Sequence, residues 1–421
     1  MIVYKFGGAS VKDAEAVKNV AEILISCPEE HVIIVQSAMG KMTNHLESIW
    51  RTWMNGEDTE ELMEQFASFH LEIAKVLELT DDALVGVTMM LDELRALLAN
   101  PAGGNSALAY DQVVSFGELV GTRLVHAGLE QQGVIIEWFD ARHVLKTDSA
   151  HRNATLDWER SKLGTDILKA HFIKGEQNFV LTQGFIAQSK VGNTTTLGRE
   201  GSDYSAAIFA HLMNASSLTI WKDVPGMLNA DPRWFNNTVR IAELTFREAI
   251  ELSYYGASVI HPKTIKPLQN KDIPLYVKSF VDKALPGTVI QKEVASSNYV
   301  PMYIFKPKQI LISISPRDFS FIVESNLRDI FEALTSTGIS VNLMQNSAIS
   351  FSVCVDQEME RIGEFIELMK SKYAIRYNEE VELLTIRHYD EATVKQLTGE
   401  KEVLVEQKSR QTLRIVLRPL I

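Results

Sequence analysis

Short apolar runs alternate with an amphipathic segment in the first part of the chain. The runs IVYKF (2–6) and HVIIV (31–35) are typical of buried strands. Between them, apolar residues from Val17 to Leu24 recur at i, i+3, i+4 and i+7, which is the spacing of one helix face. The order strand, glycine turn, helix, strand predicts a βαβ unit.

The pattern becomes helical at about residues 46–100, a segment rich in Met, Leu and Glu without a strand candidate. We interpret it as a helical insertion or lid. Strand runs then alternate with helices again, with apolar runs at 178–185, 217–224 and 273–280. This alternation is typical of a mostly parallel sheet covered by helices on both faces, so residues 1–292 are predicted to form one α/β sandwich domain.

The pattern changes again after a polar segment of small residues, 293–308, which we interpret as a linker. Residues 309–378 have the order strand, helix, strand, strand, helix, strand, which is the ferredoxin-like α+β plan. Residues 379–421 repeat only part of that plan. They predict a second, partial unit that is completed by elements from elsewhere.

Composition and charge narrow the possible functions. The chain has 421 residues, 46% hydrophobic and 23% charged, which is normal for a globular protein of two or three domains. Its formal net charge of -12 argues against nucleic acid or an acidic membrane as a partner. No apolar stretch is long enough to cross a membrane and no secretory leader is evident, so we expect a cytoplasmic location. Cys27 and Cys354 are expected to be reduced, packed thiols.

The first strand leads into the sequence KFGGAS, in which two glycines separate a lysine from a helix start. Ser10 and Asp13 have the spacing of a capping box, which predicts that the helix starts directly after the glycines. Gly7 and Gly8 would let backbone N–H groups approach phosphate oxygens, and Lys5 would add a full positive charge. By itself the pattern also fits a structural turn, and it is not a P-loop.

A second polar stretch, TLGREGSDYSA, precedes an apolar helical stripe. Ser202 is expected to be the N-cap of that helix, with Arg199 and Asp203 on either side of its start. Arg199 suits bidentate binding of a carboxylate, and Asp203 could orient Lys5 or a metal-bound phosphate. Further along, WKDVPGMLNADPR places two turns after one strand, as in a binding loop. In isolation these stretches also fit a capped helix and an ordinary turn.

Together with VQSAMGKMTN, SFGELVGTRL and GASVIHPKT, these stretches form an ordered series over roughly residues 1–290. The series resembles the motifs of aspartate kinases of the amino-acid-kinase superfamily, and the C-terminal part resembles paired ACT domains, the amino-acid-sensing modules of that family. The resemblance implies that ATP phosphorylates the β-carboxylate of L-aspartate, in the first step towards lysine, threonine and methionine. It also implies Mg²⁺ as the companion of ATP, and no tightly bound cofactor.

The resemblance assigns roles to residues of this chain. Catalysis falls to Lys5 and Asp203. The other assignments are, for aspartate, Thr43, Glu118, Phe185, Arg199 and Ser202; for ATP, Lys5, Gly7, Gly8, Ser37, Asp223 and Arg233; and for an amino-acid effector, Asn342 and Gln345. Lys222 is predicted to join the ATP site as a departure from the family, for the reason given below. No metal-ligating residue is predicted. Because the substrate carboxylate is already ionised at neutral pH, the reaction needs aligned anions and neutralised phosphoryl charge, and no general base.

The chain departs from the family at a few positions of the catalytic motifs. Ala9 replaces a threonine in the glycine turn, where the backbone does the phosphate binding. Ser258 replaces a lysine that is expected to reach the nucleotide phosphates. Lys222, which replaces a threonine, is predicted to supply the missing charge. The alternative for Lys222 is an exposed lysine at a strand end.

The C-terminal part also departs from the family pattern. Asn342 and Ala348 stand where lysine-sensitive relatives carry acidic residues. We therefore expect weak sensitivity to lysine, with threonine favoured if there is an effector. A homodimer or higher homo-oligomer through the ACT units is expected, because exposed strand edges are commonly buried between chains.

Two alternative functions remain open at this point. One is another amino-acid kinase, acting on acetylglutamate or glutamate, and the GREGSDYSA stretch and the ACT tail argue against it. The other is a catalytically weak or dead amino-acid sensor, and the presence of Lys5, Glu118, Arg199 and Asp203 argues against that. His261 is expected to be a structural turn residue.

Overall fold

The computed structural model describes residues 1–172, 176, 178–257, 260–294, 300–318, 320–399 and 401–419. The chain divides into two compact units. Unit 1 consists of Met1–Met227, Arg240–Ile250 and Ser258–Val294, and unit 2 of Leu228–Val239, Glu251–Ala257 and Ala295–Ile421. Two short segments before the C-terminal part therefore belong to unit 2, so the division is not a single cut in the sequence. In the described part of the chain, no helix is long and apolar enough to span a membrane.

Unit 1 is built on an eight-stranded sheet with the order β3-β4-β2-β1-β7-β9-β10-β8. Neighbouring strands are parallel except β9 and β10, which confirms the predicted mostly parallel sheet. The strands are β1 (Ile2–Phe6), β2 (His31–Gln36), β3 (Ile136–Phe139), β4 (Asn178–Gln183), β7 (Leu218–Lys222), β8 (Glu243–Thr245), β9 (Leu275–Ser279) and β10 (Thr288–Gln291). A separate two-stranded ladder pairs β5 (Ile186–Gln188) with β6 (Thr194–Thr196).

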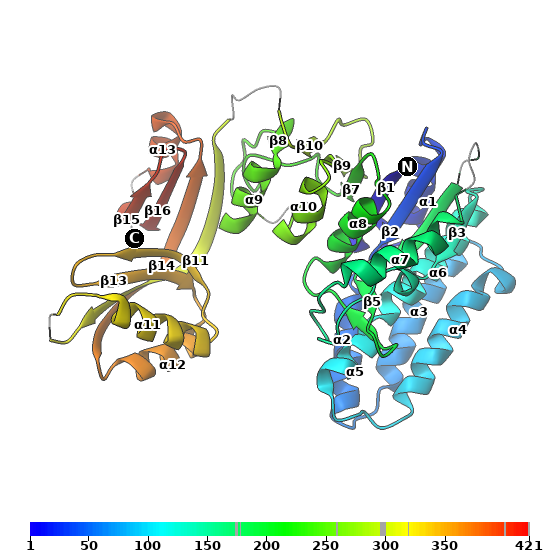
Figure 1. The fold of residues 1–421 in the computed structure, drawn as a ribbon, viewed down its shortest axis with the longest axis horizontal. Coiled ribbons are helices and arrows are strands. Elements are labelled where there is room, and N and C mark those ends of the chain that lie inside the picture. Colours follow the sequence, from blue (N-terminus) through cyan, green and yellow to red (C-terminus); the bar gives the residue numbers. More distant parts are fainter. Residues whose placement is uncertain are drawn as a thin grey trace. The chain divides into compact units, whose positions relative to one another are not determined.

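Helices connect the strands of this sheet (Figure 1). Those before β3 are η1 (Gly8–Val11), α1 (Ala14–Ile25), α2 (Met42–Met54), α3 (Glu60–Val76), α4 (Asp81–Leu98), α5 (Ser106–Val114) and α6 (Phe116–Gln131). Those after it are η2 (Ala141–His143), α7 (Trp158–Lys169), α8 (Gly201–Leu212), α9 (Phe246–Tyr255) and α10 (Pro262–Gln269). Because parallel strands end at the same edge of a sheet, the turns after β1, β2 and β7 come together there.

The first helix begins later than the sequence predicts. Its apolar face is buried as expected, from Val17 to Leu24. However, α1 starts directly after Asp13, whose side chain caps it. Ser10 lies in the short 3-10 helix η1, and its hydroxyl donates to the carbonyl oxygen of Trp221 (3.4 Å). The predicted capping box is therefore wrong, because Ser10 bonds to the neighbouring strand β7 instead of to its own helix.

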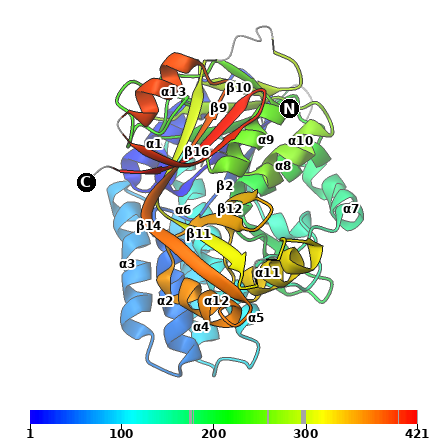
Figure 2. The same ribbon diagram turned by 90° about the vertical axis from the view of Figure 1, so that its left-hand side faces the viewer.

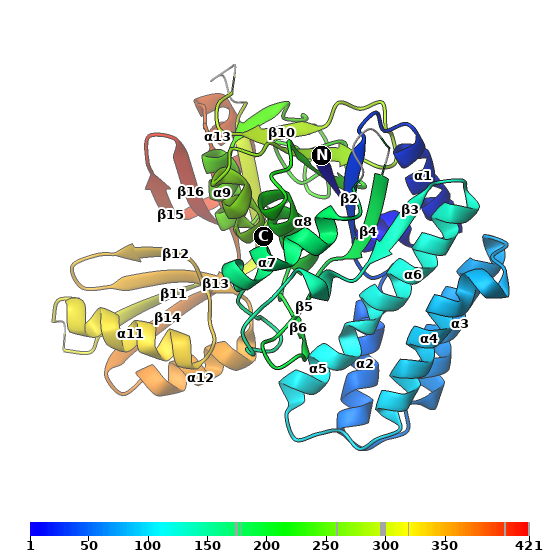
Figure 3. The same ribbon diagram turned by 45° about the vertical axis from the view of Figure 1, so that its right-hand side comes forward.

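The predicted helical insertion consists of α2, α3 and α4. Its buried side chains, among them Leu46, Phe66 and Leu94, belong to the same apolar core as Val17 and Leu24 of α1. Figure 3 shows α3 and α4 beside α6. The segment is thus an insertion that shares the core of unit 1 and not a detached lid.

Unit 2 contains a six-stranded sheet with the order β12-β13-β11-β14-β16-β15, in which neighbouring strands are antiparallel. Its elements are β11 (Met302–Pro316), α11 (Glu324–Ser336), β12 (Val341–Asn346), β13 (Phe351–Asp356), α12 (Met359–Met369), β14 (Tyr373–Arg387), α13 (Glu391–Thr398), β15 (Glu402–Lys408) and β16 (Thr412–Arg418). From β11 to β14 the element order is the predicted βαββαβ plan. The ferredoxin-like fold of this half is confirmed.

Two strands of unit 2 are longer than the sequence predicts. β11 and β14 pair along both halves, with register shifts on β11 near Lys308, which has a positive φ of 52°. Figure 2 shows β14 passing from the half with α11 and α12 into the half with α13. There, Met302–Lys306 of β11 pairs with the end of β14, beside β16. This strand is the element that the C-terminal half takes from elsewhere.

The predicted linker, 293–308, is wrong in its second part. Residues 302–308 belong to β11, because their backbone groups pair with β14. Residues 295–299 lie outside the described residues.

Three residues have the structural roles expected from the sequence. Cys27 and Cys354 are buried and form no disulfide within the described residues, and burial raises the pKa of the Cys354 thiol to about 12. His261 precedes α10, where its Nδ1 accepts a hydrogen bond from the Lys263 amide (3.2 Å). It therefore caps a helix, as a structural residue would.

Candidate active site

The turns at the carboxyl edge of the unit 1 sheet border a cavity of about 530 Å³. Its walls come from β1, the turn after β2, the start of α8, and helices α2, α5 and α6. The residues that line it are Lys5, Ser37, Thr43, Asn44, Glu47, Tyr110, Glu118, Arg152, Phe185, Gly198, Arg199, Glu200, Gly201, Ser202 and Asp203. The cavity thus brings together both predicted catalytic residues and all the residues predicted to bind aspartate.

At the sheet end of the cavity, one carboxylate binds two ammonium groups. Lys5 Nζ lies 2.6 Å from Asp203 Oδ1, and Lys222 Nζ lies 3.8 Å from Asp203 Oδ2. Asp203 is only 1% exposed. Burial would raise its pKa, but the charges of Lys5 and Lys222 outweigh burial and hold the pKa below its ordinary value. With two positive charges against one negative charge, the cluster suits an anion such as phosphate.

The two glycines after β1 allow close approach of the backbone at this end. A Cβ at Gly8 would lie 2.7 Å from the Gly40 carbonyl oxygen and 2.8 Å from that of Ala38, so Gly8 packs against the turn after β2. A Cβ at Gly7 would lie 3.2 Å from Lys5 Nζ. Neither glycine lines the cavity itself. Gly8 joins two turns, and Gly7 leaves room for the lysine ammonium group.

Glu118, on α6, is a buried carboxylate in the same cavity and is 2% exposed. Its Oε1 accepts a hydrogen bond from the Ala38 amide (3.2 Å), whereas Oε2 has no hydrogen-bond partner among the described residues. Burial raises the pKa of Glu118 to about 8, and the hydrogen bond from Ala38 opposes this shift only in part. Such a carboxylate gains most from a ligand that brings a positive charge.

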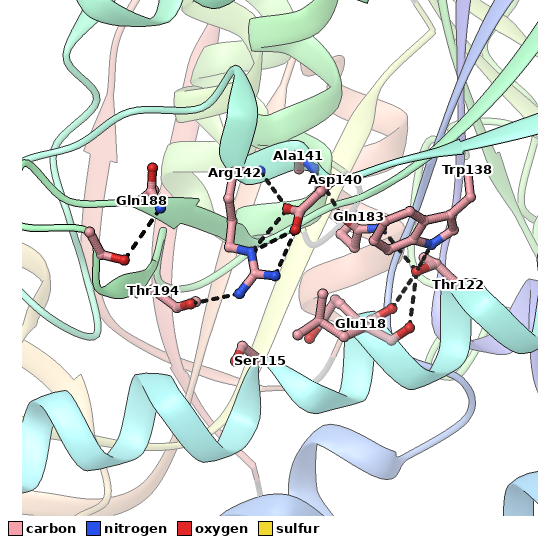
Figure 4. Close-up of polar contacts among 12 residues, drawn as sticks. Ser115, Glu118, Thr122, Trp138, Asp140, Ala141, Arg142, Gln183, Gln188 and Thr194 are labelled. Atoms are coloured by element: carbon pink, nitrogen blue, oxygen red, sulfur yellow. Dashed lines mark hydrogen bonds and ion pairs between the residues drawn. The ribbon is translucent and has the colours of Figure 1, made fainter. Parts of the chain in front are cut away.

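Hydrogen bonds one turn further along α6 hold Glu118 in place (Figure 4). The Thr122 hydroxyl donates to the Glu118 carbonyl oxygen (2.7 Å) and accepts from Trp138 Nε1 and Gln183 Nε2, both at 3.0 Å. Trp138 and Gln183 lie on β3 and β4. This network therefore sets the position of Glu118 relative to the strands of the sheet.

The start of α8 differs from the sequence prediction. The helix begins at Gly201, and the residue before it, Glu200, has a left-handed backbone with φ of 55°. Ser202 lies in the first turn and not at the N-cap, so this prediction is wrong. The left-handed turn at Glu200 starts the helix two residues earlier than a cap at Ser202 would. Ser202 and Arg199 nevertheless both line the cavity.

The far wall of the cavity was missed by the sequence analysis. Asn44 and Glu47 lie on α2, Tyr110 on α5, and Arg152 on the loop between η2 and α7. The segments of Tyr110 and Arg152 carry no recognisable motif, whereas Asn44 is the last residue of the VQSAMGKMTN stretch. One signal could have found part of this wall, since Glu47 follows the predicted site residue Thr43 by four positions and so shares its helix face.

Other predicted site residues lie outside the cavity lining. Asp223 is exposed after β7, and Arg233 belongs to unit 2, where it pairs with Asp231 (2.6 Å). Asn342 and Gln345 lie on β12 of unit 2. Ser258 lies outside the described residues. In the part of the chain that the structure describes, no group of three or more His, Cys, Asp or Glu side chains is arranged to hold a metal ion.

Comparisons with known proteins agree with this geometry. Residues 1–279 match the Amino acid kinase family. The chain is 31% identical over 357 residues to the lysine-sensitive aspartokinase 3 of Escherichia coli (strain K12). The aligned region covers 85% of this chain and 78% of that protein. Two crystal structures of E. coli aspartokinase III are similar at 27% identity. The complex with lysine and aspartate (T-state) has a TM-score of 0.83 and covers 99% of this chain and 95% of that chain. The complex with aspartate and ADP (R-state) has a TM-score of 0.79 and covers 99% and 96%.

Proposed function

This chain belongs to the amino acid kinase family and, within it, to the aspartokinases, and on that premise we propose that it transfers the γ-phosphoryl group of ATP to the β-carboxylate of L-aspartate. The products are β-aspartyl phosphate and ADP. This reaction is the first step of the pathway to lysine, threonine and methionine. The similar E. coli structure with aspartate and ADP supports the same pair of ligands here.

The observation that carries the proposal is the combination of charges in one cavity. Glu118 has an oxygen that no described residue hydrogen-bonds, and it suits the ammonium group of an amino acid. Arg199 suits its α-carboxylate. Lys5, held by Asp203, suits the phosphates of ATP. An amino acid anchored by its ammonium and α-carboxylate groups can direct its side-chain carboxylate to the phosphate end.

The chemistry follows from positioning and charge neutralisation. The β-carboxylate is ionised at neutral pH and can attack the γ-phosphorus without a general base. Lys5 neutralises negative charge on the transferring phosphoryl group, and Asp203 holds the Lys5 ammonium in place. Mg²⁺, which accompanies ATP, would neutralise further phosphate charge.

The nucleotide side of the proposal comprises Lys5, Gly7, Gly8, Ser37, Lys222, Asp223 and Arg233. The ion pair between Lys222 and Asp203 supports the role of Lys222, because it places a second ammonium group close to that of Lys5. Ser37 is supported by its place in the cavity wall. The roles of Asp223 and Arg233 rest on the family resemblance alone.

We further propose that the ACT units bind an amino-acid effector through Asn342 and Gln345, with threonine favoured over lysine, and that they form a homodimer. Asn342 Oδ1 accepts a hydrogen bond from Lys306 Nζ (2.8 Å). An internal ammonium group therefore already occupies the acceptor that a lysine effector would need. A cytoplasmic location stays a prediction from the sequence.

The proposed activity is tested by trapping the acyl phosphate. With ATP and Mg²⁺, the protein should consume aspartate and form aspartyl hydroxamate in the presence of hydroxylamine, with ADP released in equal amount. Glutamate and acetylglutamate should be poor substrates. Turnover of either at or above the rate with aspartate would favour another amino-acid kinase, and no turnover with any of the three would favour a sensor.

A further inference from the structure

Arg152 is a cavity residue to which neither the motifs nor the proposed mechanism assigns a role. It has a left-handed backbone with φ of 68°, which is uncommon for a residue other than glycine. Its amide donates to both carboxylate oxygens of Asp111, at 3.0 and 3.1 Å. Asp111 is fully buried and also accepts hydrogen bonds from His151 (2.8 Å) and Thr196 (2.6 Å). The backbone at Arg152 is therefore held in a strained conformation by a buried anchor.

The side chain of Arg152 rests on two aromatic rings. Its guanidinium carbon lies 4.2 Å from the ring centroid of Tyr110 and 5.4 Å from that of Trp50. The Tyr110 hydroxyl donates to Glu47 (2.7 Å), so this ring is fixed in turn. Glu47 also lies 4.0 Å from the guanidinium of Arg51. The aromatic contacts orient Arg152 while leaving its N–H groups available to a ligand.

The loop of Arg152 lies directly against the loop of Arg199. A Cβ at Gly198 would lie 3.3 Å from the Arg152 carbonyl oxygen and 2.6 Å from Asn153 Oδ1. The Ala154 amide also donates to the Thr196 carbonyl oxygen (2.9 Å). Two guanidinium groups from touching loops therefore line one cavity. Among the described residues, no carboxylate forms an ion pair with either of them.

We propose that Arg152 binds the α-carboxylate of the amino-acid substrate together with Arg199, as the second half of a two-arginine clamp. The inference rests on the proposed aspartate kinase activity. Aspartate has one carboxylate that must meet the phosphates near Lys5 and one that must be held away from them. Paired guanidinium groups would hold that second carboxylate in a fixed orientation. Arg152 would thus contribute to the choice of an amino acid with a free α-carboxylate.

The test uses Arg152→Gln, which removes the charge but keeps a polar side chain, and Arg95→Gln as a control on α4, outside the cavity. Arg152→Gln should raise the KM for aspartate about tenfold, as for the loss of one charge-assisted contact, with kcat and the KM for ATP within about twofold of wild type. Arg95→Gln should match wild type in all three. An unchanged KM for aspartate, or a change in the KM for ATP instead, would overturn the proposal.

A substrate analogue separates direct contact from a structural role. The 1-amide of L-aspartic acid keeps the ammonium and β-carboxylate groups but has no α-carboxylate charge. With this analogue, wild type and Arg152→Gln should have the same kcat/KM within about twofold. An equal loss with aspartate and with the amide would show that Arg152 only supports the cavity wall. If Arg152→Gln folds poorly, Arg152→Gly, which fits a positive φ, provides the same comparison.

Failure of the proposed function can be told apart from failure of this inference. The wild-type hydroxamate assay decides the function without any variant. If wild type does not turn over aspartate, calorimetric titration of aspartate into wild type and Arg152→Gln still tests the clamp, with about tenfold weaker binding expected in the variant. Equal affinities, or no binding to wild type, would overturn it.

Discussion

The cavity of unit 1 and a polar cluster of unit 2 both contain polar and charged side chains. They differ in whether these side chains already have partners within the protein. In the cavity, Glu118 has an oxygen without a partner, and Arg152 and Arg199 have no carboxylate partner among the described residues. In unit 2, Lys306 Nζ donates to Asn342 Oδ1. The charged groups of the cavity are therefore available to a ligand, whereas the polar groups of the cluster already bond to one another.

The other side chains of the unit 2 cluster are also hydrogen-bonded to one another. Asn342 Nδ2 donates to Gln309 Oε1 (2.8 Å) and to Asp356 Oδ1 (2.9 Å), and Gln309 Nε2 donates to Asp356 Oδ1 (2.8 Å). A buried polar group without a partner costs stability unless a ligand pairs with it. Substitutions in the cavity should therefore act mainly on ligand kinetics, and those in the cluster mainly on the folded state and on effector binding.

The largest effect is expected at Lys5. Lys5→Ala removes the ammonium group that Asp203 holds at the phosphate end. It should lower kcat by roughly 10²-fold or more, with a smaller effect on the KM for aspartate, in steady-state assays of ADP release. Lys12→Ala, at an exposed lysine of the same segment, should behave like wild type. A kcat of Lys5→Ala within about twofold of wild type would place the phosphate end elsewhere.

The next effect is expected at Glu118. Glu118→Gln should raise the KM for aspartate by about a hundredfold, because an amide cannot pair with the substrate ammonium as a carboxylate does. Since burial raises the pKa of Glu118 to about 8, the wild-type KM for aspartate should fall as pH rises towards 8. The variant should lack this pH dependence. A KM with the same pH profile in both proteins would contradict the assignment.

The same pKa predicts a change in stability with pH in the absence of ligand. The pKa of Glu118 is raised from 4.5 to about 8 in the folded state. Its contribution to stability is therefore fully present below pH 4.5 and is lost as pH rises through 8. Thermal denaturation from pH 5 to 9 should show wild type losing stability relative to Glu118→Gln. A constant difference in Tm across this range would contradict the raised pKa.

A smaller effect is expected at Lys222. Lys222→Thr should lower kcat/KM for ATP by roughly tenfold to a hundredfold, as for one charged phosphate contact. Adding Ser258→Lys to it should recover much of the loss, because the charge returns at the position used by the family. Unaltered ATP kinetics in Lys222→Thr would reduce this residue to a partner of Asp203.

The smallest effect is expected in unit 2. Lysine should inhibit the wild-type protein only weakly, because Lys306 occupies the acceptor of Asn342. Lys306→Met should increase inhibition by lysine, measured as the concentration for half-maximal activity, and threonine should inhibit more strongly than lysine in wild type. If lysine inhibits wild type strongly and Asn342→Ala abolishes this inhibition, Asn342 binds lysine despite Lys306, and the prediction is wrong.

Local patterns predicted much of the fold. The repeat of apolar residues along the chain is a local pattern that spans a few residues. It predicted the apolar face of α1, the strands β1 and β2, and the order of elements from β11 to β14. Helix starts were less predictable. Ser10 could cap α1 by its sequence spacing, but its hydroxyl bonds to Trp221, which is distant in sequence. The local capping pattern therefore failed to predict the hydrogen bond of Ser10, because its partner comes close only in the folded chain.

The candidate site was predictable where a motif carries the chemistry and not elsewhere. Lys5, Arg199 and Asp203 lie in motifs, and they meet in the cavity. Tyr110 and Arg152 lie in segments without one, so nothing along the chain indicated that their loops and helices would form its far wall. Their place depends on how α5 and the loop before α7 pack in unit 1.

The sequence by itself determined the fold class, the family and the side chains available for phosphate and amino-acid binding, because periodicity and motifs act along the chain. Only the tertiary structure decided which charges meet. Asp203 pairs with Lys5 and Lys222 because β1 and β7 end, and α8 begins, at one edge of the sheet. Glu118 has a raised pKa because the fold removes water from it, and no described residue hydrogen-bonds its second oxygen. Burial and electrostatic coupling act through space, so they are set by the packing of distant segments and not by neighbours in the sequence.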